Sequence, residues 1–308
     1  MLASPESGFR LIFSYFGHYG VQVFIFFCTY GLTRKYYQKP FVISQFLAGR
    51  IDKIYLSFLL CLAVYILLGL IKSELTPGEK VLYWDSLFWK ILLVSNFIPG
   101  QALMPVGPWW FMPFIFQVYV LYPLLLKRYQ KHGYKFLILI SLTALLAESQ
   151  INSYLITKGL NINHTVFGHL PVLCLGIFLA AQERIEIPAL YAWLSLFLFV
   201  LGLYNAYAWI VSDIAFTIFA LATSTTFFRL LLHADFTARV FIFFGNISFP
   251  LFMVNGFLRS PFHRFAETFN LWWVDNLSAL ASLLFSTLFA YYLSMLDNQV
   301  RAVFPSKS

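Results

Sequence analysis

Two basic residues one helical turn apart form the clearest chemical pair in this 308-residue chain. Arg50 and Lys53 stand directly before the apolar stretch 54–71, and a spacing of three places both side chains on one face of a helix. Arg can bind a phosphate through two parallel hydrogen bonds, and Lys acts as a point charge. The pair is therefore a candidate phosphate-binding site. The alternative is loop charge that sets the orientation of a membrane protein.

Polar side chains inside apolar segments form a second group of candidates. Gln117 and Asp213 lie within such segments, where polar groups are costly and mark either function or hydrogen bonds between helices. For Asp213 we expect a buried partner or a position facing a cavity rather than catalysis. Ser248 and Asn255 fall in one later segment. Asn255 can position a substrate by hydrogen bonding but cannot act as a base at neutral pH.

Two adjacent tryptophans and one histidine complete the candidates. Trp109 and Trp110 are either interfacial anchors of membrane helices or platforms on which a carbohydrate ring stacks. His18, near the outer face, is the one histidine considered as a general base. The other five are predicted in cytoplasmic loops or near the outer face: His132, His164, His169, His233 and His263. The three cysteines form no CxxC pair, and no zinc-protease, nucleophile-elbow or P-loop motif occurs, so no metal is expected.

The elements that must position these residues are membrane helices. Hydrophobic residues make up 60% of the chain and charged residues 11%, against about 25% charged in soluble domains. The apolar runs are continuous, whereas a membrane β-barrel would show alternating polarity. We therefore predict an all-α integral membrane protein, a bundle of about nine transmembrane helices in a single domain over residues 1–308. The predicted spans are 12–33, 54–71, 108–126, 136–150, 166–182, 188–204, 207–228, 240–258 and 275–296, with 82–97 interfacial or re-entrant.

The loop charges predict the orientation. One side of the predicted bundle receives twice as many Lys and Arg residues as the other, and the richer side should be cytoplasmic. This places the C-terminus, Arg50 and Lys53 in the cytoplasm. The net charge of +8 is spread between apolar segments, so we expect contact with lipid headgroups and no binding of nucleic acid.

Four segments, in order, resemble the acyltransferase 3 family of membrane O-acyltransferases. They are GVQVFIFFCTYGL (20–32), RIDKIY (50–55), GPWWFMP continuing to Tyr122-Pro123 (107–123) and GNISFPLFMVNG (245–256). A weaker fifth is HLP leading to Gly176 (169–176). Each motif is short, but the ordered set covers nearly the whole chain.

The resemblance implies an activity and its site. Members of the family have ten helices and move an acyl group from cytoplasmic acyl-CoA to extracytoplasmic glycans. The resemblance implies that acyl-CoA, expected to be acetyl-CoA, is the donor substrate and that it binds at Arg50 and Lys53. It implies no bound cofactor. The other candidates would contact the acceptor or line the cavity: Trp109, Trp110, Gln117, Ser248 and Asn255.

The chain also departs from the family pattern. Cys28-Thr29 replaces Ser-Gly, Lys53 replaces Arg and Asn255 replaces His. Residues 20–32 resemble the family's second helix, so we expect the first helix, with its Arg and catalytic His, to be missing and this chain to be impaired or inactive as written. Acid–base catalysis contributes about 10²–10⁴-fold in rate.

Two classes of function follow. The first is a membrane O-acyltransferase of the bacterial inner (plasma) membrane that modifies a hydroxyl of an envelope or exported glycan or glycolipid. The alternative is a non-catalytic relative or a transporter-like protein that translocates a glycan or lipid.

Overall fold

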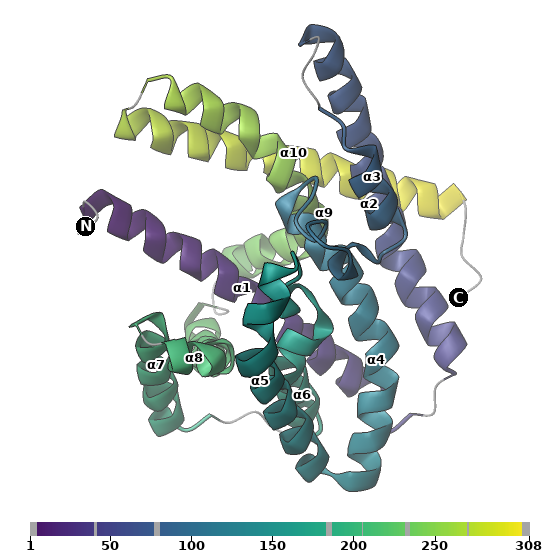
Figure 1. The fold of residues 1–308 in the computed structure, drawn as a ribbon, viewed down its shortest axis with the longest axis vertical. Coiled ribbons are helices and arrows are strands. Elements are labelled where there is room, and N and C mark those ends of the chain that lie inside the picture. Colours follow the sequence, from purple (N-terminus) through teal and green to yellow (C-terminus); the bar gives the residue numbers. More distant parts are fainter. Residues whose placement is uncertain are drawn as a thin grey trace. The chain divides into compact units, whose positions relative to one another are not determined.

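The computed structural model describes residues 5–39, 42–76, 81–182, 187–204, 206–231, 235–269 and 271–303. Within these ranges the side chains of 5–19, 203–204, 206–210, 224–231 and 235 are not described. Every regular element in the described part of the chain is a helix (Figure 1). The α-helices are α1 (Pro5–Tyr36), α2 (Ile43–Leu75), α3 (Trp84–Ile91), α4 (Phe111–His132), α5 (Tyr134–Thr157), α6 (Leu170–Ala180), α7 (Ala189–Tyr204), α8 (Ala206–Leu231), α9 (Asp235–Glu267) and α10 (Trp272–Val303).

Four short 3₁₀ helices connect these elements among the described residues: η1 (Ser95–Phe97), η2 (Gly107–Trp110), η3 (Ile162–His164) and η4 (Val166–His169). Each of the nine predicted spans coincides mainly with helical residues. The span 108–126 begins in η2 and continues in α4, and the span 166–182 combines η4 with the 11-residue α6. The predicted interfacial segment 82–97 contains α3 and η1. The predicted all-α membrane fold is therefore confirmed.

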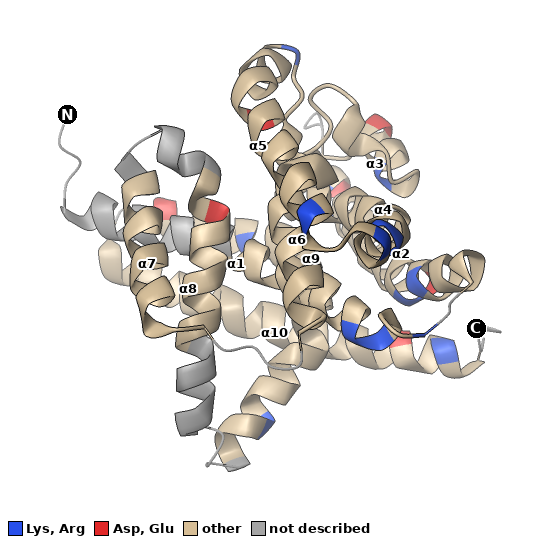
Figure 2. Cartoon of the chain, turned by 90° about the horizontal axis from the view of Figure 1, so that it is seen from below, with Lys and Arg blue, Asp and Glu red and all other residues tan. Residues whose placement is uncertain are grey.

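The helices carry little charge along their length, as Figure 2 shows. Five helices in the described ranges are long and apolar enough to cross a membrane: Ile43–Leu75, Gly107–His132, Tyr134–Thr157, Phe236–Glu267 and Trp272–Val303. Shorter apolar helices cover Val166–Ala180, Ala189–Gly202 and Val211–Thr223. Large apolar side chains such as Leu67 on α2 and Leu288 on α10 are more than half exposed, which a lipid solvent tolerates because the helix satisfies its own backbone.

The chain divides into two compact units, and each is described by itself. The first unit contains residues 1–41 and 120–233, in which α6 packs against α1 and α5, α8 packs against α1, and α7 lies beside α8. The second contains residues 42–119 and 234–308, in which α2, α9 and α10 pack together and η2 packs on α9. The prediction of one domain over the whole chain stays a prediction.

Candidate functional site

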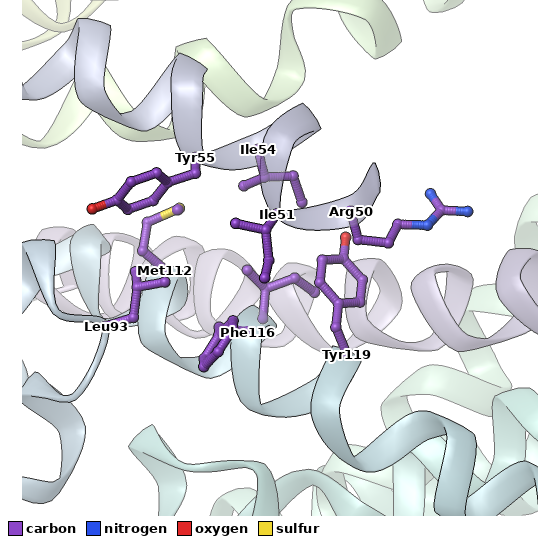
Figure 3. A pocket seen from close by; sticks show the side chains of 9 residues that line it. Arg50, Ile51, Ile54, Tyr55, Leu93, Met112, Phe116 and Tyr119 are labelled. Atoms are coloured by element: carbon purple, nitrogen blue, oxygen red, sulfur yellow. The ribbon is translucent and has the colours of Figure 1, made fainter. Parts of the chain in front are cut away.

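Arg50 lies at the edge of an apolar groove in the second unit (Figure 3). Its neighbours in the groove come from α2, from the segment that follows α3 and from the first half of α4: Ile51, Ile54, Tyr55, Leu93, Met112, Ile115, Phe116 and Tyr119. The groove is open and shallow, with a volume of only about 10 Å³, enough for about one water molecule. The Arg50 guanidinium extends away from this lining and lies 5.9 Å from the Phe46 ring centroid. Arg50 therefore presents its charge at the surface.

Lys53 follows one turn later on α2, and its side chain is exposed. The residue between the two cations, Asp52, is held by Arg301 near the end of α10. The Arg301 Nη1 atom lies 3.5 Å from Asp52 Oδ2, and its guanidinium also donates to the backbone carbonyls of Asp52 (3.2 Å) and Lys53 (2.8 Å). Arg301 thus engages the carboxylate that would otherwise compete for Arg50 and Lys53.

A second carboxylate anchors Arg301 from its own helix. Asp297 Oδ2 accepts hydrogen bonds from Arg301 Nε and from Ser57 Oγ, each at 3.0 Å. Arg301 is 25% exposed and Asp297 15%, so the ion pair is largely shielded from solvent. These contacts fix α10 against the part of α2 that carries the basic pair.

Trp109 joins two of the sequence motifs inside the second unit. Its indole is fully buried, and Nε1 donates to the backbone carbonyl of Met253 on α9 at 2.9 Å. The rings of Phe58, Tyr65 and Phe257 surround it at centroid distances of 5.5, 5.2 and 6.1 Å. The motifs at 107–123 and 245–256 are therefore packed together, and Trp109 has no face on which a sugar ring could stack in this conformation.

The packing of η2 on α9 also explains why the motif at 245–256 has a glycine at position 256. A Cβ atom added to Gly256 would lie 2.6 Å from Val106 Cγ1 and 2.9 Å from Pro108 Cδ. Glycine therefore allows α9 to approach the start of η2 closely. Asn255 stands beside this contact, half-buried on α9.

The remaining predicted acceptor residues are more dispersed. Trp110 is half-buried, and its backbone carbonyl accepts a hydrogen bond from Asn96 Nδ2 at 2.8 Å. Ser248 donates to Gly245 O within its own helix at 2.8 Å, a local bond common for helical serines. Gln117 lies half-buried on α4. The structure thus brings Trp109 to the part of α9 that carries Asn255, whereas the acceptor roles of all five residues stay predictions.

A buried lysine stabilises the segment that leads to Trp109. The Lys90 side chain of α3 is 0% exposed, and Nζ donates to the backbone carbonyl of Ala102. Ser86 Oγ donates to Gln101 Oε1 at 2.6 Å, which ties the same helix to the same loop. Burial lowers the pKa of Lys90 from 10.5 to about 7. The loop between α3 and η2 is therefore held by polar contacts made inside the protein.

A comparison with protein-family models decides the family. The model described as an acyltransferase domain, Acyl_transf_3, matches residues 2–295. The chain belongs to the acyltransferase 3 family. The resemblance inferred from the ordered motifs is thus confirmed, and the match runs through both compact units. No curated protein and no solved structure matches the chain.

In this acyltransferase 3 chain a buried polar network occupies the first unit. His169, at the start of α6, is 2% exposed, and its Nδ1 lies 3.1 Å from Gln22 Oε1 on α1. Gln22 Nε2 donates to Asp213 Oδ2 on α8 at 2.7 Å. His169 Nε2 lies 2.9 Å from the backbone carbonyl of Asn163. The network links three helices, and both ring nitrogens of His169 are engaged by protein oxygens.

Sequence reasoning expected a buried partner or a cavity-facing position for Asp213 but did not identify His169 or Gln22 as its neighbours. The predicted position of His169 near the outer face did not indicate burial. The available signals were a charged residue within an apolar span and the HLP motif that begins at His169. Its engaged nitrogens make His169 a structural member of the network in this conformation.

Two further motifs meet in the first unit. A Cβ atom added to Gly176 on α6 would lie 2.2 Å from Thr29 Oγ1 and 2.8 Å from Phe26 O on α1. The motif at 169–176 and the motif at 20–32 are therefore in close contact, and glycine permits it. Thr29, which replaces the family's small residue, is fully buried at this contact.

The remaining site predictions concern His18 and a metal. The side chain of His18 lies outside the described residues. Among the described residues no three His, Cys, Asp or Glu side chains are grouped as metal ligands. The absence of a metal stays a prediction.

Proposed function

We propose that this protein is an O-acyltransferase of the bacterial inner membrane. It takes an acyl group, acetyl in the simplest case, from cytoplasmic acyl-CoA and transfers it to a hydroxyl of an envelope or exported glycan. Membership of the acyltransferase 3 family supports acyl transfer. The arrangement of Arg50, Lys53 and Arg301 supports the donor site.

The observation that carries the donor assignment is the engagement of Asp52 by Arg301. An uncompensated carboxylate between two cations would weaken their attraction for phosphate. With the Arg301 Nη1 atom 3.5 Å from Asp52 Oδ2, Arg50 and Lys53 remain available as cations on adjacent turns. CoA carries a diphosphate and a ribose phosphate, so a bidentate Arg and a nearby Lys fit its charge pattern.

The groove beside Arg50 limits what this site can hold. The groove is shallow, with a volume of about 10 Å³, and it is too small to bury the acyl arm of the donor. Arg50 and Lys53 therefore act on the phosphates, while the thioester reaches the acceptor elsewhere.

The transfer itself needs one nucleophile and one base. The acceptor oxygen attacks the thioester carbonyl, a carbon–oxygen bond forms, and the carbon–sulfur bond breaks. The hydroxyl proton passes to a base and then to the CoA sulfur, so that CoA leaves as the thiol. Trp110, Gln117, Ser248 and Asn255 are proposed to contact the acceptor, with Asn255 as a hydrogen-bonding group.

The test is acyl transfer across oriented membranes. Inside-out and right-side-out vesicles that contain the full chain are given acetyl-CoA labelled in the acetyl group, and alkali-labile label is measured in the envelope glycan fraction. We expect label from inside-out vesicles, at the impaired rate that the sequence predicts, and none from right-side-out vesicles. Label no higher than in vesicles without the protein would overturn acyl transfer. Label from right-side-out vesicles alone would overturn the orientation.

A further inference from the structure

A larger cavity lies in the second unit, between the candidate membrane spans α2, α9 and α10. Its volume is about 680 Å³, within the range of about 300–1,000 Å³ that is typical of ligand pockets. The described lining is apolar except for Lys72, Ser260 and Arg264. Its largest members are aromatic: Tyr65, Phe257, Phe262, Phe285 and Phe289.

The cavity opens to the bilayer. Leu68 of α2 and Phe285 of α10 line it and are 41% and 46% exposed. Both stand inside candidate membrane spans, where an exposed side chain meets hydrocarbon and not water. The ring centroids of Phe285 and Phe262 lie 5.9 Å apart, so the aromatic wall continues from α10 to α9. A molecule that enters between these helices must therefore come through the lipid and present an apolar surface.

The polar lining residues stand towards one end of their helices. Lys72 is three residues before the end of α2. Ser260 and Arg264 are seven and three residues before the end of α9. At about 1.5 Å of rise per residue, all three lie within about 10 Å of a helix end. In the orientation predicted from the loop charges both ends are extracytoplasmic, so an amphiphile would place its chain among the aromatic rings and its polar head at the extracytoplasmic surface.

The aromatic rings also connect the cavity to the candidate acceptor residues. Tyr65 and Phe257 line the cavity and meet edge to face, with ring centroids 5.6 Å apart. Both rings contact Trp109, at centroid distances of 5.2 and 6.1 Å. Asn255, which is proposed to contact the acceptor, precedes Phe257 by two residues on α9. Arg50, at the proposed donor site, precedes Tyr65 by fifteen residues, a rise of about 22 Å along α2. The cavity is therefore beside the acceptor candidates and distant from the donor phosphates.

We propose that this cavity holds the hydrocarbon chain of a lipid-linked acceptor, with the glycan at the extracytoplasmic ends of α2 and α9. The proposal rests on the proposed acyl transfer and narrows its acceptor to glycans joined to a membrane lipid. A free polysaccharide has no hydrocarbon to fill a cavity that opens to the bilayer. A lipid-linked glycan carries both the apolar chain and the polar head that the cavity fits.

The first experiment maps where a hydrocarbon chain binds. The full chain in lipid nanodiscs is irradiated with dodecyl maltoside that carries a diazirine at the chain end, and the labelled residues are identified by mass spectrometry. We expect labelling of the lining on α2, α9 and α10, which excess unlabelled dodecyl maltoside suppresses about tenfold or more and maltose at the same concentration does not. Labelling of the lining that dodecyl maltoside fails to suppress, or that maltose suppresses equally, would overturn the chain site.

Two adjacent leucines supply a variant and its matched control. Leu68 lines the cavity, whereas Leu67 lies outside the lining and is 58% exposed. Leu68→Trp should lower the labelling of α9 and α10 about tenfold, because the larger side chain takes the place of the ligand, and Leu67→Trp should be labelled like wild type. Ser260→Trp narrows the cavity from α9 and provides the same test if Leu68→Trp does not fold. Equal labelling of the control and the folded lining variant would contradict the proposal.

The second experiment separates the acceptor class from acyl transfer itself. Inside-out vesicles that contain the full chain receive acetyl-CoA labelled in the acetyl group, and alkali-labile label is measured in solvent-extractable, lipid-linked glycan and in water-soluble glycan. We expect label in the extractable fraction, about tenfold less with Leu68→Trp than with Leu67→Trp. Label in the water-soluble fraction alone would overturn the lipid-linked acceptor. No label in either fraction would instead overturn the proposed acyl transfer, whereas the photolabelling decides the chain site independently.

Discussion

Lys90 offers a quantitative test of the buried segment before Trp109. Burial lowers its pKa in the folded protein to about 7, against 10.5 for an unburied lysine. Between these pH values the unfolded chain binds more protons than the folded chain, so the free energy of unfolding rises with pH. At about 1.4 kcal/mol per pKa unit, this one group should raise the stability by about 2 kcal/mol between pH 7 and pH 9.

The perturbation is Lys90→Met, which keeps the length of the side chain and removes its charge. The variant loses the hydrogen bond to Ala102 O. This loss should lower the free energy of unfolding by about 1–3 kcal/mol at every pH. The assay follows unfolding in mild detergent by tryptophan fluorescence at pH 7, 8 and 9. Lys127→Met, which removes a charge from an exposed position, serves as the control.

Wild type and Lys127→Met should gain stability in parallel as the pH rises, and Lys90→Met should gain about 2 kcal/mol less between pH 7 and pH 9. If the free energy of unfolding rises equally with pH in Lys90→Met and wild type, the pKa of Lys90 is not lowered by burial, and the reasoning is refuted.

Three further predictions concern contacts seen in the structure. Arg301→Gln should weaken acetyl-CoA binding about three- to tenfold, because it releases Asp52. Adding Asp52→Asn should restore most of the lost affinity. If the double variant binds as weakly as Arg301→Gln, Arg301 does not act on donor binding through Asp52. Trp109→Ala should lower the free energy of unfolding by about 3–5 kcal/mol. Trp272 is 66% exposed, so Trp272→Ala should lower the free energy of unfolding much less. Similar losses for the two variants would argue against Trp109 as a core residue. In a double-mutant cycle, Gln22→Leu and Asp213→Leu should show a coupling energy of about 0.5–3 kcal/mol, and additive effects would contradict the network with His169.

The sequence was sufficient to predict the helices because each span is encoded locally. A continuous apolar run of about 20 residues has few alternatives to a membrane helix. The predicted spans coincide with helices for this reason, and the span 166–182, which is divided between η4 and the short helix α6, is the exception in length. The predicted interfacial segment also contains the short helix α3, whose Asp85 and Lys90 interrupt the apolar pattern.

The contacts of the candidate site could not be predicted in the same way. Trp109 meets Met253 across 144 residues, and His169 meets Gln22 across 147, so neither pairing leaves a periodic signal in the sequence. Interfacial and buried tryptophans follow similar apolar patterns, and only the packing around Trp109 distinguishes them. The same holds for Lys90, whose charge predicts exposure although its side chain is buried.

The orientation of the chain rests on loop charge alone. A reporter fused after Ser308 should be cytoplasmic, and one inserted within 75–87 should be extracytoplasmic, because Lys and Arg favour the cytoplasmic side. The opposite result would remove Arg50 and Lys53 from the side on which acyl-CoA is found.

The central claim is that Arg50 and Lys53 hold the acyl donor, and equilibrium binding of acetyl-CoA to the purified full chain tests it most directly. Arg50→Ala/Lys53→Ala should weaken binding about tenfold or more, since each charge-assisted hydrogen bond contributes about 1.5–3 kcal/mol. The control Lys127→Ala/Arg128→Ala removes an exposed basic pair from α4 and should leave binding unchanged. Equal affinity for wild type and the Arg50/Lys53 variant, or an equal loss in the control, would contradict the assignment.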